Sequence, residues 1–207
     1  MSDEIVFYTN PMSRARIVRW MLEEVGHPYR VELLDYGTTM KAPDYLAINP
    51  MGKVPAIVHR GQVVTEGAAI CAYLADAFPD AGLAPPLTER AAYYRWLFFV
   101  AGPFDSAIVD KALARDIPPE RAGMVGYSNI DAVLGAIETA LDGRAFIASD
   151  TFSAADCYVA SCLSFYMRFG MVPQTPVFRG YVDRMEARPA YLRAGELDGP
   201  MPGPKAA

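Results

Sequence analysis

Cysteine, histidine and long apolar stretches are scarce in this 207-residue chain, which has three Cys and two His. The odd number of cysteines (Cys71, Cys157 and Cys162), without CxxC spacing, argues against a secreted disulfide scaffold and favours burial in the core. The longest apolar stretch has about nine residues, half of what a membrane span needs. Lys and Arg total 19 against 24 Asp and Glu, a net charge of −5, so the basic field that binds nucleic acids or anionic membranes is missing. We therefore expect a cytoplasmic protein with no nucleic acid or membrane as a partner.

Motifs of several common enzyme classes are also missing. Neither His27 nor His59 has a GxSxG or HExxH pattern around it, so a serine-hydrolase site or a metal site is not expected. No GxGxxG is present, and Gly52-Lys53 lacks both the upstream glycine and the following Ser or Thr of a P-loop. The chemistry of this chain therefore has to come from other groups.

The first part of the chain alternates between β-rich and helical segments. Its patterns predict strands at 5–8, 29–34, 56–59 and 62–65, helices at 14–25 and 67–78, and a helical turn at 44–48. Arg60-Gly61, between the last two strands, is a two-residue hairpin signal. The order β-α-β and then β-β-α predicts an α/β domain with a mixed four-stranded sheet.

Helical spacing dominates after a stretch rich in proline. The patterns predict helices at 88–108, with a kink at Gly102-Pro103, at 120–141 and at 153–169, and shorter ones at 176–187 and 191–194. Ser153 and Asp156 form a capping-box pattern at the start of the third of these helices. We expect one domain at 1–79, a linker at 80–87 and an all-helical domain at 88–207, with a disordered tail from about residue 195.

Tyr8 and Ser13 lie where the first strand gives way to the first helix. A helix N-terminus has unpaired N–H groups and a partial positive charge, so it favours an anion, to which Ser13 could donate its hydroxyl. Ser13 could equally be an ordinary helix cap, and Tyr8 an ordinary core residue. The nearby Arg14, Arg16 and Arg19 form a basic cluster; Arg19 can pair with Glu23, so we expect mostly a solvated face.

Two further pairs could bind a ligand through their backbone. If the peptide bond between Val54 and Pro55 is cis, neighbouring backbone groups turn outward and can pair with an extended peptide; an ordinary trans proline at a strand start is the alternative. Glu66-Gly67 precedes a helix and could hold the ammonium and the carboxylate of an α-amino acid. A helix start with no ligand explains the same residues.

Four segments, taken together, resemble the cytosolic glutathione S-transferase family. They are PMSRARIVRWMLEEVG (11–26), NPMGKVPAI (49–57), TEGAAICAYLADAFP (65–79) and FSAADCYVA (152–160). The resemblance, which runs from about residue 5 to 194, implies a thioredoxin-like N-terminal domain with a mixed sheet, a C-terminal helical-bundle domain and a homodimer. It also implies that the first domain binds glutathione as co-substrate, without a metal, and that a small hydrophobic electrophile binds in a cleft between the two domains. The implied function is activation of the glutathione thiolate for attack on that electrophile, as in detoxification.

The same resemblance assigns residues to the glutathione site. It implies that Val54-Pro55 is cis and that the backbone of Val54 holds the cysteinyl part of glutathione. Glu66 matches the acidic residue at the γ-glutamyl end. Gly67 stands where relatives usually have a serine, so one hydroxyl donor is missing. Lys41 and Lys53 stand where relatives place groups that reach the glycyl carboxylate.

The catalytic and electrophile-binding residues follow from the resemblance as well. Ser13 resembles the thiol-binding Ser of the serine-type classes, and Tyr8 has a position similar to the Tyr of the tyrosine-type classes. No Cys occurs in 5–20, so the cysteine-type classes are disfavoured. We expect Ser13 to activate the thiol, with Tyr8 as the alternative and Arg14 adding electrostatic help. Aromatic residues crowd the helices after the linker, and for the electrophile site we expect Tyr94, Phe98, Phe104 and Tyr166, with core packing as the alternative for at least half of the aromatic residues.

Two other functions fit the same fold. One is a glutathione-dependent peroxidase or thiol reductase. The other is a non-catalytic binding or regulatory protein, because a fold does not by itself imply a function. Gly67, which lacks the usual hydroxyl, gives weight to the second.

Overall fold

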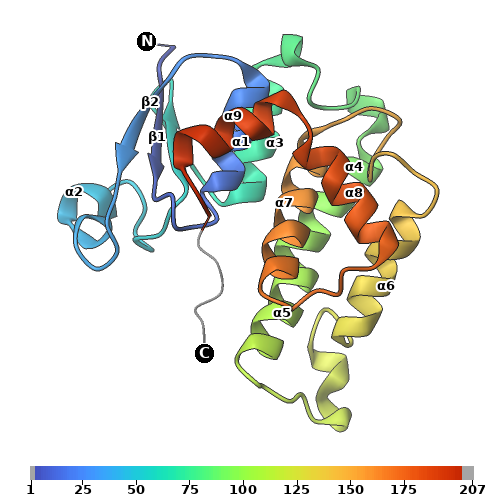
Figure 1. Ribbon diagram of the computed structural model, residues 1–207. Coiled ribbons are helices and arrows are strands. Elements are labelled where there is room, and N and C mark those ends of the chain that lie inside the picture. The colour runs from blue at the N-terminus through green and yellow to red at the C-terminus, as the bar shows by residue number, and fades with distance from the viewer. Residues whose placement is uncertain (1–2, 202–207) are drawn as a thin grey trace. The chain divides into compact units, whose positions relative to one another are not determined.

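The computed structural model describes residues 3–201, which form two compact units. The first unit holds the chain up to Ala84 and the segment that begins at Ala187; the second is Pro85–Glu186 (Figure 1). Within residues 3–201 no helix has both the length and the apolarity to cross a membrane.

A mixed four-stranded sheet in the order β2-β1-β3-β4 forms the centre of the first unit. Strand β1 (Ile5–Thr9) runs parallel to β2 (Tyr29–Leu33) and antiparallel to β3 (Ala56–His59), which pairs with the antiparallel β4 (Gln62–Thr65). Arg60 and Gly61 join β3 to β4 with φ values of 52° and 76°, the left-handed turn that a two-residue hairpin requires. The predicted mixed sheet and hairpin are confirmed.

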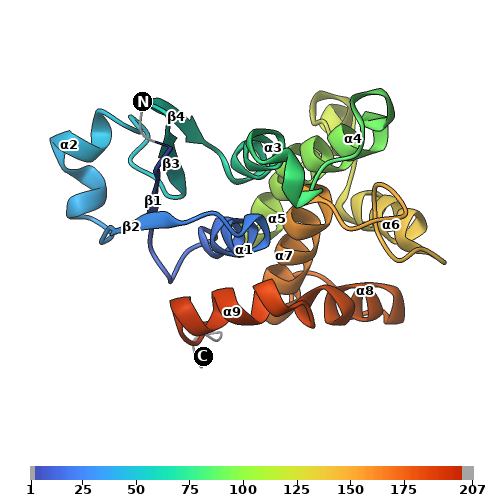
Figure 2. The ribbon, with the colours of Figure 1, turned by 90° about the horizontal axis from the view of Figure 1, so that it is seen from above.

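Helices cover both faces of this sheet. Helices α1 (Arg16–Val25) and α3 (Gly67–Ala77) lie together against one face, and the short α2 (Pro43–Leu46) lies on the other side (Figure 2). Ile5, Phe7 and Ile57 share the face toward α1 and are fully buried. A 3₁₀ turn, Thr39–Lys41, precedes α2. This is the thioredoxin-like arrangement that the resemblance implies.

The last helix, α9 (Pro189–Asp198), belongs to the first unit. It packs on α1, where the rings of Trp20 and Tyr191 meet edge to face with centroids 5.1 Å apart. The tail that we expected to be disordered from about residue 195 is helical up to Asp198, because the carboxylate of Asp198 is buried against Arg19. Residues 202–207 lie outside the described residues. The domain limits 1–79, 80–87 and 88–207 stay a prediction, and contacts group the end of the chain differently.

The second unit contains only helices. They are α4 (Ala91–Phe99), α5 (Asp105–Ala112), α6 (Ile130–Leu141), α7 (Ala154–Arg168) and α8 (Pro176–Glu186), with short 3₁₀ turns at Leu87–Glu89 and Pro119–Met124. A π-helical turn, Val100–Phe104, contains Pro103 and separates α4 from α5, so the predicted kink is confirmed. Helix α6 begins later than expected, because the side chain of Asn129 accepts from the N–H of Ala132 at 2.8 Å and caps the helix there.

The predicted capping box starts α7. The carboxylate of Asp156 accepts from the N–H and the hydroxyl of Ser153, both at 3.0 Å, from the N–H of Ile147 at 2.7 Å and from the hydroxyl of Tyr181 at 2.9 Å. Burial raises the pKa of Asp156, although these hydrogen bonds oppose the rise, and burial also raises the pKa of Tyr181. All three cysteines are buried, as expected.

Candidate functional site

One end of the sheet gathers the segments that the sequence marked as candidates. Tyr8 of β1 pairs with Ala56 of β3, and Ala56 pairs with Thr65 of β4. The carboxyl ends of β1 and β4 therefore meet the amino end of β3. Because each strand continues into a candidate segment at this end, the structure brings the following residues to one edge: Tyr8, Ser13, Val54, Pro55, Glu66 and Gly67.

Val54 lies two residues before β3, and its peptide bond to Pro55 is cis, as the resemblance implies. Val54 and Tyr8 both pack against a buried cluster formed by Met40, Tyr45 and Ala56. Within residues 3–201 the N–H and the C=O of Val54 make no hydrogen bond to another residue. These two groups are therefore open to an outside partner.

The loop before Val54 is fixed by hydrogen bonds to its carbonyl groups. The carbonyl of Lys53 accepts from the hydroxyl of Tyr45 at 2.5 Å and from the side-chain amide of Asn49 at 2.9 Å. Burial raises the pKa of Tyr45 to about 12, so its hydroxyl remains a donor through the physiological range. Neither side chain was among the candidates from the sequence, although the turn residues of Asn49-Pro50-Met51-Gly52 could have indicated a bracing role.

Lys41 fixes the same loop from another side. Its ammonium group donates to the carbonyls of Met51 at 3.1 Å and of Gly52 at 2.9 Å. Gly52 has φ +56°, and a Cβ there would lie 2.7 Å from both the Lys41 Nζ and the Met40 carbonyl oxygen. Only glycine, which has no Cβ, lets the backbone at position 52 come this close to Met40 and Lys41. Lys41, expected to reach a ligand, thus holds the loop in this structure, while Lys53 is exposed.

The start of α3 is the second part of the candidate site. Glu66 precedes the helix with φ 67°, which is uncommon for a residue other than glycine, and its side chain is exposed. The first turn of α3 contains no acidic residue. Its unpaired N–H groups give this end a partial positive charge, so Gly67 and its neighbours can hold a carboxylate.

Ser13 lies in the turn between β1 and α1 and not at the helix cap itself. Its hydroxyl donates to the carbonyl of Asn10 at 2.7 Å and accepts from the N–H of Ala15 at 3.0 Å. The side chain of Asn10 holds the turn in place by donating to the carbonyl of Leu34 at 2.7 Å. Arg14, next to Ser13, has an exposed side chain.

Tyr8 occupies the other face of the sheet. Its ring is half-buried and lies 5.5 Å from that of Tyr45, centroid to centroid, whereas the neighbouring Phe7 faces α1. The structure therefore places the two candidate thiol-binding hydroxyls in different surroundings, Ser13 before a helix and Tyr8 against an aromatic ring.

The expectation of a solvated arginine face on α1 is wrong for Arg19. Its guanidinium lies 5.0 Å from the ring centroid of Phe7, and its Nε donates to Asp198 at 3.1 Å, with both side chains buried. The expected partner, Glu23, instead accepts from the hydroxyl of Tyr29. The i, i+4 spacing indicated a pair between Arg19 and Glu23, but in the structure Arg19 pairs with the distant Asp198.

The four residues expected at the electrophile site belong to the helical unit and separate into two groups. Tyr94 and Phe98 lie one turn apart on α4, with 41% and 71% of their surface exposed. Phe104 and Tyr166 are buried and pack edge to face with ring centroids 5.7 Å apart, and the Tyr166 hydroxyl donates to Asp105 at 2.9 Å. This second arrangement is that of a core and not of a ligand-binding wall.

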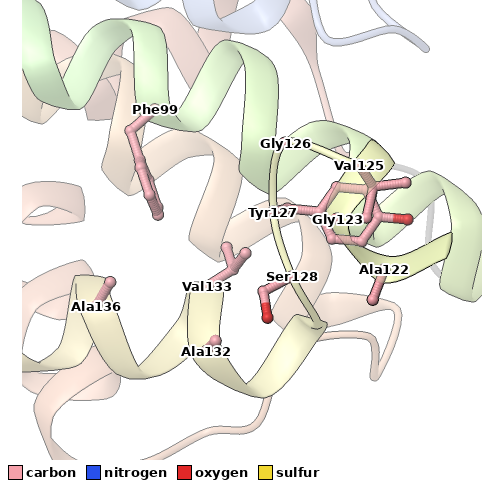
Figure 3. Close-up of a pocket in the computed structure, with 10 residues that line it drawn as sticks. All are labelled: Phe99, Ala122, Gly123, Val125, Gly126, Tyr127, Ser128, Ala132, Val133 and Ala136. Atoms are coloured by element: carbon pink, nitrogen blue, oxygen red, sulfur yellow. The ribbon is translucent and has the colours of Figure 1, made fainter. Parts of the chain in front are cut away.

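A pocket of about 560 Å³ opens within the helical unit, between α4, α6 and residues 122–128. Figure 3 shows the ring of Phe99 on one side, the ring of Tyr127 on the other and Val133 on α6 between them. No charged side chain lines it, and Tyr127 is tied to Asp110 by a hydrogen bond of 2.5 Å. The volume is in the usual range for small-molecule sites, but the pocket contains none of the expected electrophile residues.

Comparison with known proteins gives the family. Residues 11–77 match the N-terminal domain of glutathione S-transferases, and residues 126–189 match their C-terminal domain. Glutathione S-transferase GST-4.5 of Xanthomonas campestris pv. campestris is 32% identical over 171 residues, which cover 79% of this chain and 83% of that protein. A sphingomonad glutathione S-transferase solved in complex with glutathione superimposes with a TM-score of 0.77 at 28% identity, over 94% of this chain and 98% of the other. A stringent starvation protein A homolog of Histophilus somni is 26% identical over 184 residues, 87% of this chain and 84% of that protein.

The fold is thus a thioredoxin-like domain with a mixed sheet, together with a helical C-terminal domain. The chain belongs to the glutathione S-transferase family.

Proposed function

We propose that the protein is a glutathione transferase that binds glutathione at the edge of the sheet and activates its thiol for attack on an apolar electrophile. The observation that carries this proposal is that the N–H and the C=O of Val54 are open to an outside partner. Hydrogen bonds from Tyr45 and Asn49 hold the loop before Val54 in place, next to the start of α3. An extended peptide needs such backbone partners, and an α-amino acid end needs a cation-binding and an anion-binding group side by side.

In this proposal glutathione lies along the edge of the sheet. The N–H and C=O of Val54, set by Pro55, pair with the cysteinyl residue. The helix end at Gly67 binds the γ-glutamyl carboxylate and Glu66 binds its ammonium group. Lys53, which is exposed, reaches the glycyl carboxylate.

Ser13 is the proposed activating residue. A thiol with a pKa near 8.5 is only a few per cent ionised at neutral pH, and lowering that pKa by about two units, or roughly 2.7 kcal/mol, makes the thiolate dominant. The Ser13 hydroxyl, turned from Asn10 to the sulfur, would donate a hydrogen bond, and the start of α1 and the nearby Arg14 would add positive potential. Tyr8 is the alternative, but the α1 terminus does not support it on its face of the sheet.

The proposed reaction joins the thiolate to an electrophilic carbon. The sulfur lone pair forms the S–C bond, and the leaving group departs with the electron pair of the bond that breaks. Tyr94 and Phe98, the exposed aromatic pair on α4, support an apolar second substrate, because a planar ring can stack on them. The homodimer implied by the resemblance and the cytoplasmic location expected from the composition stay predictions, and sedimentation of the pure protein checks the first.

Glutathione binding by calorimetry, and conjugation of a chloro-nitroaromatic compound, test the function. Absorbance of the bound thiolate across pH tests the residue: we expect Ser13→Ala to raise the pKa of the bound thiol by one to two units, roughly, and Tyr8→Phe to leave it unchanged. The reverse result would assign the thiol to Tyr8.

A non-catalytic glutathione-binding or regulatory protein is the second candidate function. Gly67 lacks the hydroxyl that the family usually has there, and one relative bears the name of a stringent starvation protein and not of a transferase. Binding of glutathione without turnover of any electrophile or hydroperoxide would favour this function. Turnover of hydroperoxides or disulfides alone would favour a peroxidase or reductase on the same fold.

A further inference from the structure

Two arginines of α1 hold the carboxyl end of α9. The guanidinium of Arg16 donates to the carbonyls of Asp198 at 3.4 Å and of Gly199 at 2.5 Å. Arg19, three residues further along α1, donates to the Asp198 carboxylate at 3.1 Å. Both views show α9 beside α1 (Figures 1 and 2).

These contacts give hydrogen-bond partners to the carbonyl groups at the carboxyl end of α9. The last carbonyls of a helix have no partner within the helix and carry a partial negative charge, which basic side chains near that end usually offset. The last turn of α9 has no basic residue. Arg16 therefore caps the end of α9 from a different helix, Arg19 pairs with the Asp198 side chain, and these contacts fix the guanidinium of Arg16 in one place.

Arg16 also reaches the turn that carries Ser13. Its guanidinium donates to the carbonyl of Pro11 at 3.1 Å, which closes the chain between Pro11 and Arg16 into a ring around Ser13. On the other side of the turn, Asn10 Oδ1 accepts from the N–H of Met12 at 2.9 Å. Arg16 thus joins the turn of Ser13 to the end of α9 through one planar group with several donors in a fixed arrangement.

We propose that Arg16 is a positioning residue for Ser13 and that the carboxyl end of α9 holds it in place. The inference rests on the proposed function, because it takes Ser13 as the group that binds the thiol. Nη1 of Arg16 donates to the carbonyls of both Pro11 and Asp198, and Nη2 donates to that of Gly199, so the contacts with the end of α9 hold the guanidinium where it reaches Pro11. Without them the long side chain regains its rotamers, the Pro11 contact becomes intermittent, and the Ser13 hydroxyl spends time away from the sulfur.

Arg16→Met tests this, because it keeps the length of the side chain and removes the donors. We expect the pKa of the bound thiol to rise by about one unit and kcat below that pKa to fall about tenfold. KM for glutathione should change less than about twofold, since the proposed binding groups lie just before β3 and at the start of α3. Arg16→Lys, which keeps the charge but has no planar fork, should recover part of the loss.

The matched controls separate this inference from the proposed function. Arg193→Met removes an exposed α9 pair with Glu196 and should change neither the pKa nor kcat. In a Ser13→Ala background, Arg16→Met should add no further rise, because its effect passes through Ser13.

If Ser13→Ala raises the pKa of the bound thiol and Arg16→Met does not, the inference is wrong and the proposed function stands. If Ser13→Ala has no effect, the thiol assignment fails and the inference fails with it. An Arg16→Met variant that loses glutathione affinity and thiol activation together would show a purely structural role and overturn the inference.

Discussion

Replacement of Gly52 by alanine should damage both the stability of the first unit and its affinity for glutathione. Alanine at a left-handed φ costs roughly 1–2 kcal/mol. The added Cβ would also stand 2.7 Å from the Met40 carbonyl, which is backbone and cannot rotate away. The loop must then shift and weaken the bond from Lys41 to the Gly52 carbonyl, at about 1 kcal/mol. The expected loss of stability is about 2–3 kcal/mol.

Gly61→Ala is the matched control for this experiment. Gly61 has a similar φ of 76°, but a Cβ there meets nothing within 4 Å. It should lose only the roughly 1–2 kcal/mol of the left-handed conformation and keep its glutathione affinity. Gly52→Ala should weaken glutathione about tenfold, the equivalent of one hydrogen bond to the displaced Val54 peptide.

Urea unfolding and titration calorimetry measure the two effects. The two tryptophans lie one in each unit, Trp20 in α1 and Trp96 in α4. In a Trp96→Phe background the fluorescence reports the first unit alone, which avoids mixing two transitions. If Gly52→Ala and Gly61→Ala lose the same stability and the same affinity, the contact of a Cβ at position 52 with Met40 and Lys41 has no effect, and the reasoning is refuted.

Two further predictions concern buried polar groups. Asp156→Ala leaves four donors without their acceptor, two of them N–H groups that cannot turn away, and should lower the free energy of unfolding by about 3–5 kcal/mol in urea titrations. Asp131→Ala, an exposed acid in the first turn of α6, should cost less than about 1 kcal/mol, and equal losses would contradict the role of the buried network. For Tyr45, burial raises the pKa to about 12; the stability linked to it is complete below pH 10, roughly the pKa of an unfolded tyrosine, and is lost as pH rises toward 12. Alkaline unfolding of Tyr45→Phe should therefore lack part of this loss, and an unchanged profile would contradict the assignment.

Local patterns were enough to predict most elements of the first unit. The β1, β3, β4 and α3 segments follow their periodicity to within a residue or so, because each is short and ends at a turn residue. For α6 the sequence indicated a helix only within roughly 120–141, and the side chain of Asn129 sets its start at Ile130. For α9, Gly195 suggested an end, yet contacts with α1 carry the helix on to Asp198. Such a distant packing partner overrides local propensity.

The residues of the candidate site also fall into two groups, those that the sequence could indicate and those that only the folded structure shows. The residues at the sheet edge follow from short motifs, so the resemblance could indicate Val54, Pro55 and Glu66 by position. The groups that hold them could not be found so easily. Tyr45, Asn49 and Arg16 act through single hydrogen bonds to backbone carbonyls, and these bonds leave no periodic pattern in a sequence. Only the folded arrangement shows which carbonyl each side chain reaches.

The return of α9 to the first unit has a consequence for how this protein is made. The helical unit interrupts the sheet-containing unit in the chain, so a ribosome completes all of the second unit before it supplies the last helix of the first. Until then Trp20 lacks Tyr191 and Arg19 lacks Asp198, and a nascent first unit exposes both a large apolar ring and a cation meant for burial. Such exposed surface favours aggregation and chaperone binding during synthesis. Premature termination between residue 85 and the start of α9 would therefore yield an incomplete first unit, even though its entire sheet had been translated.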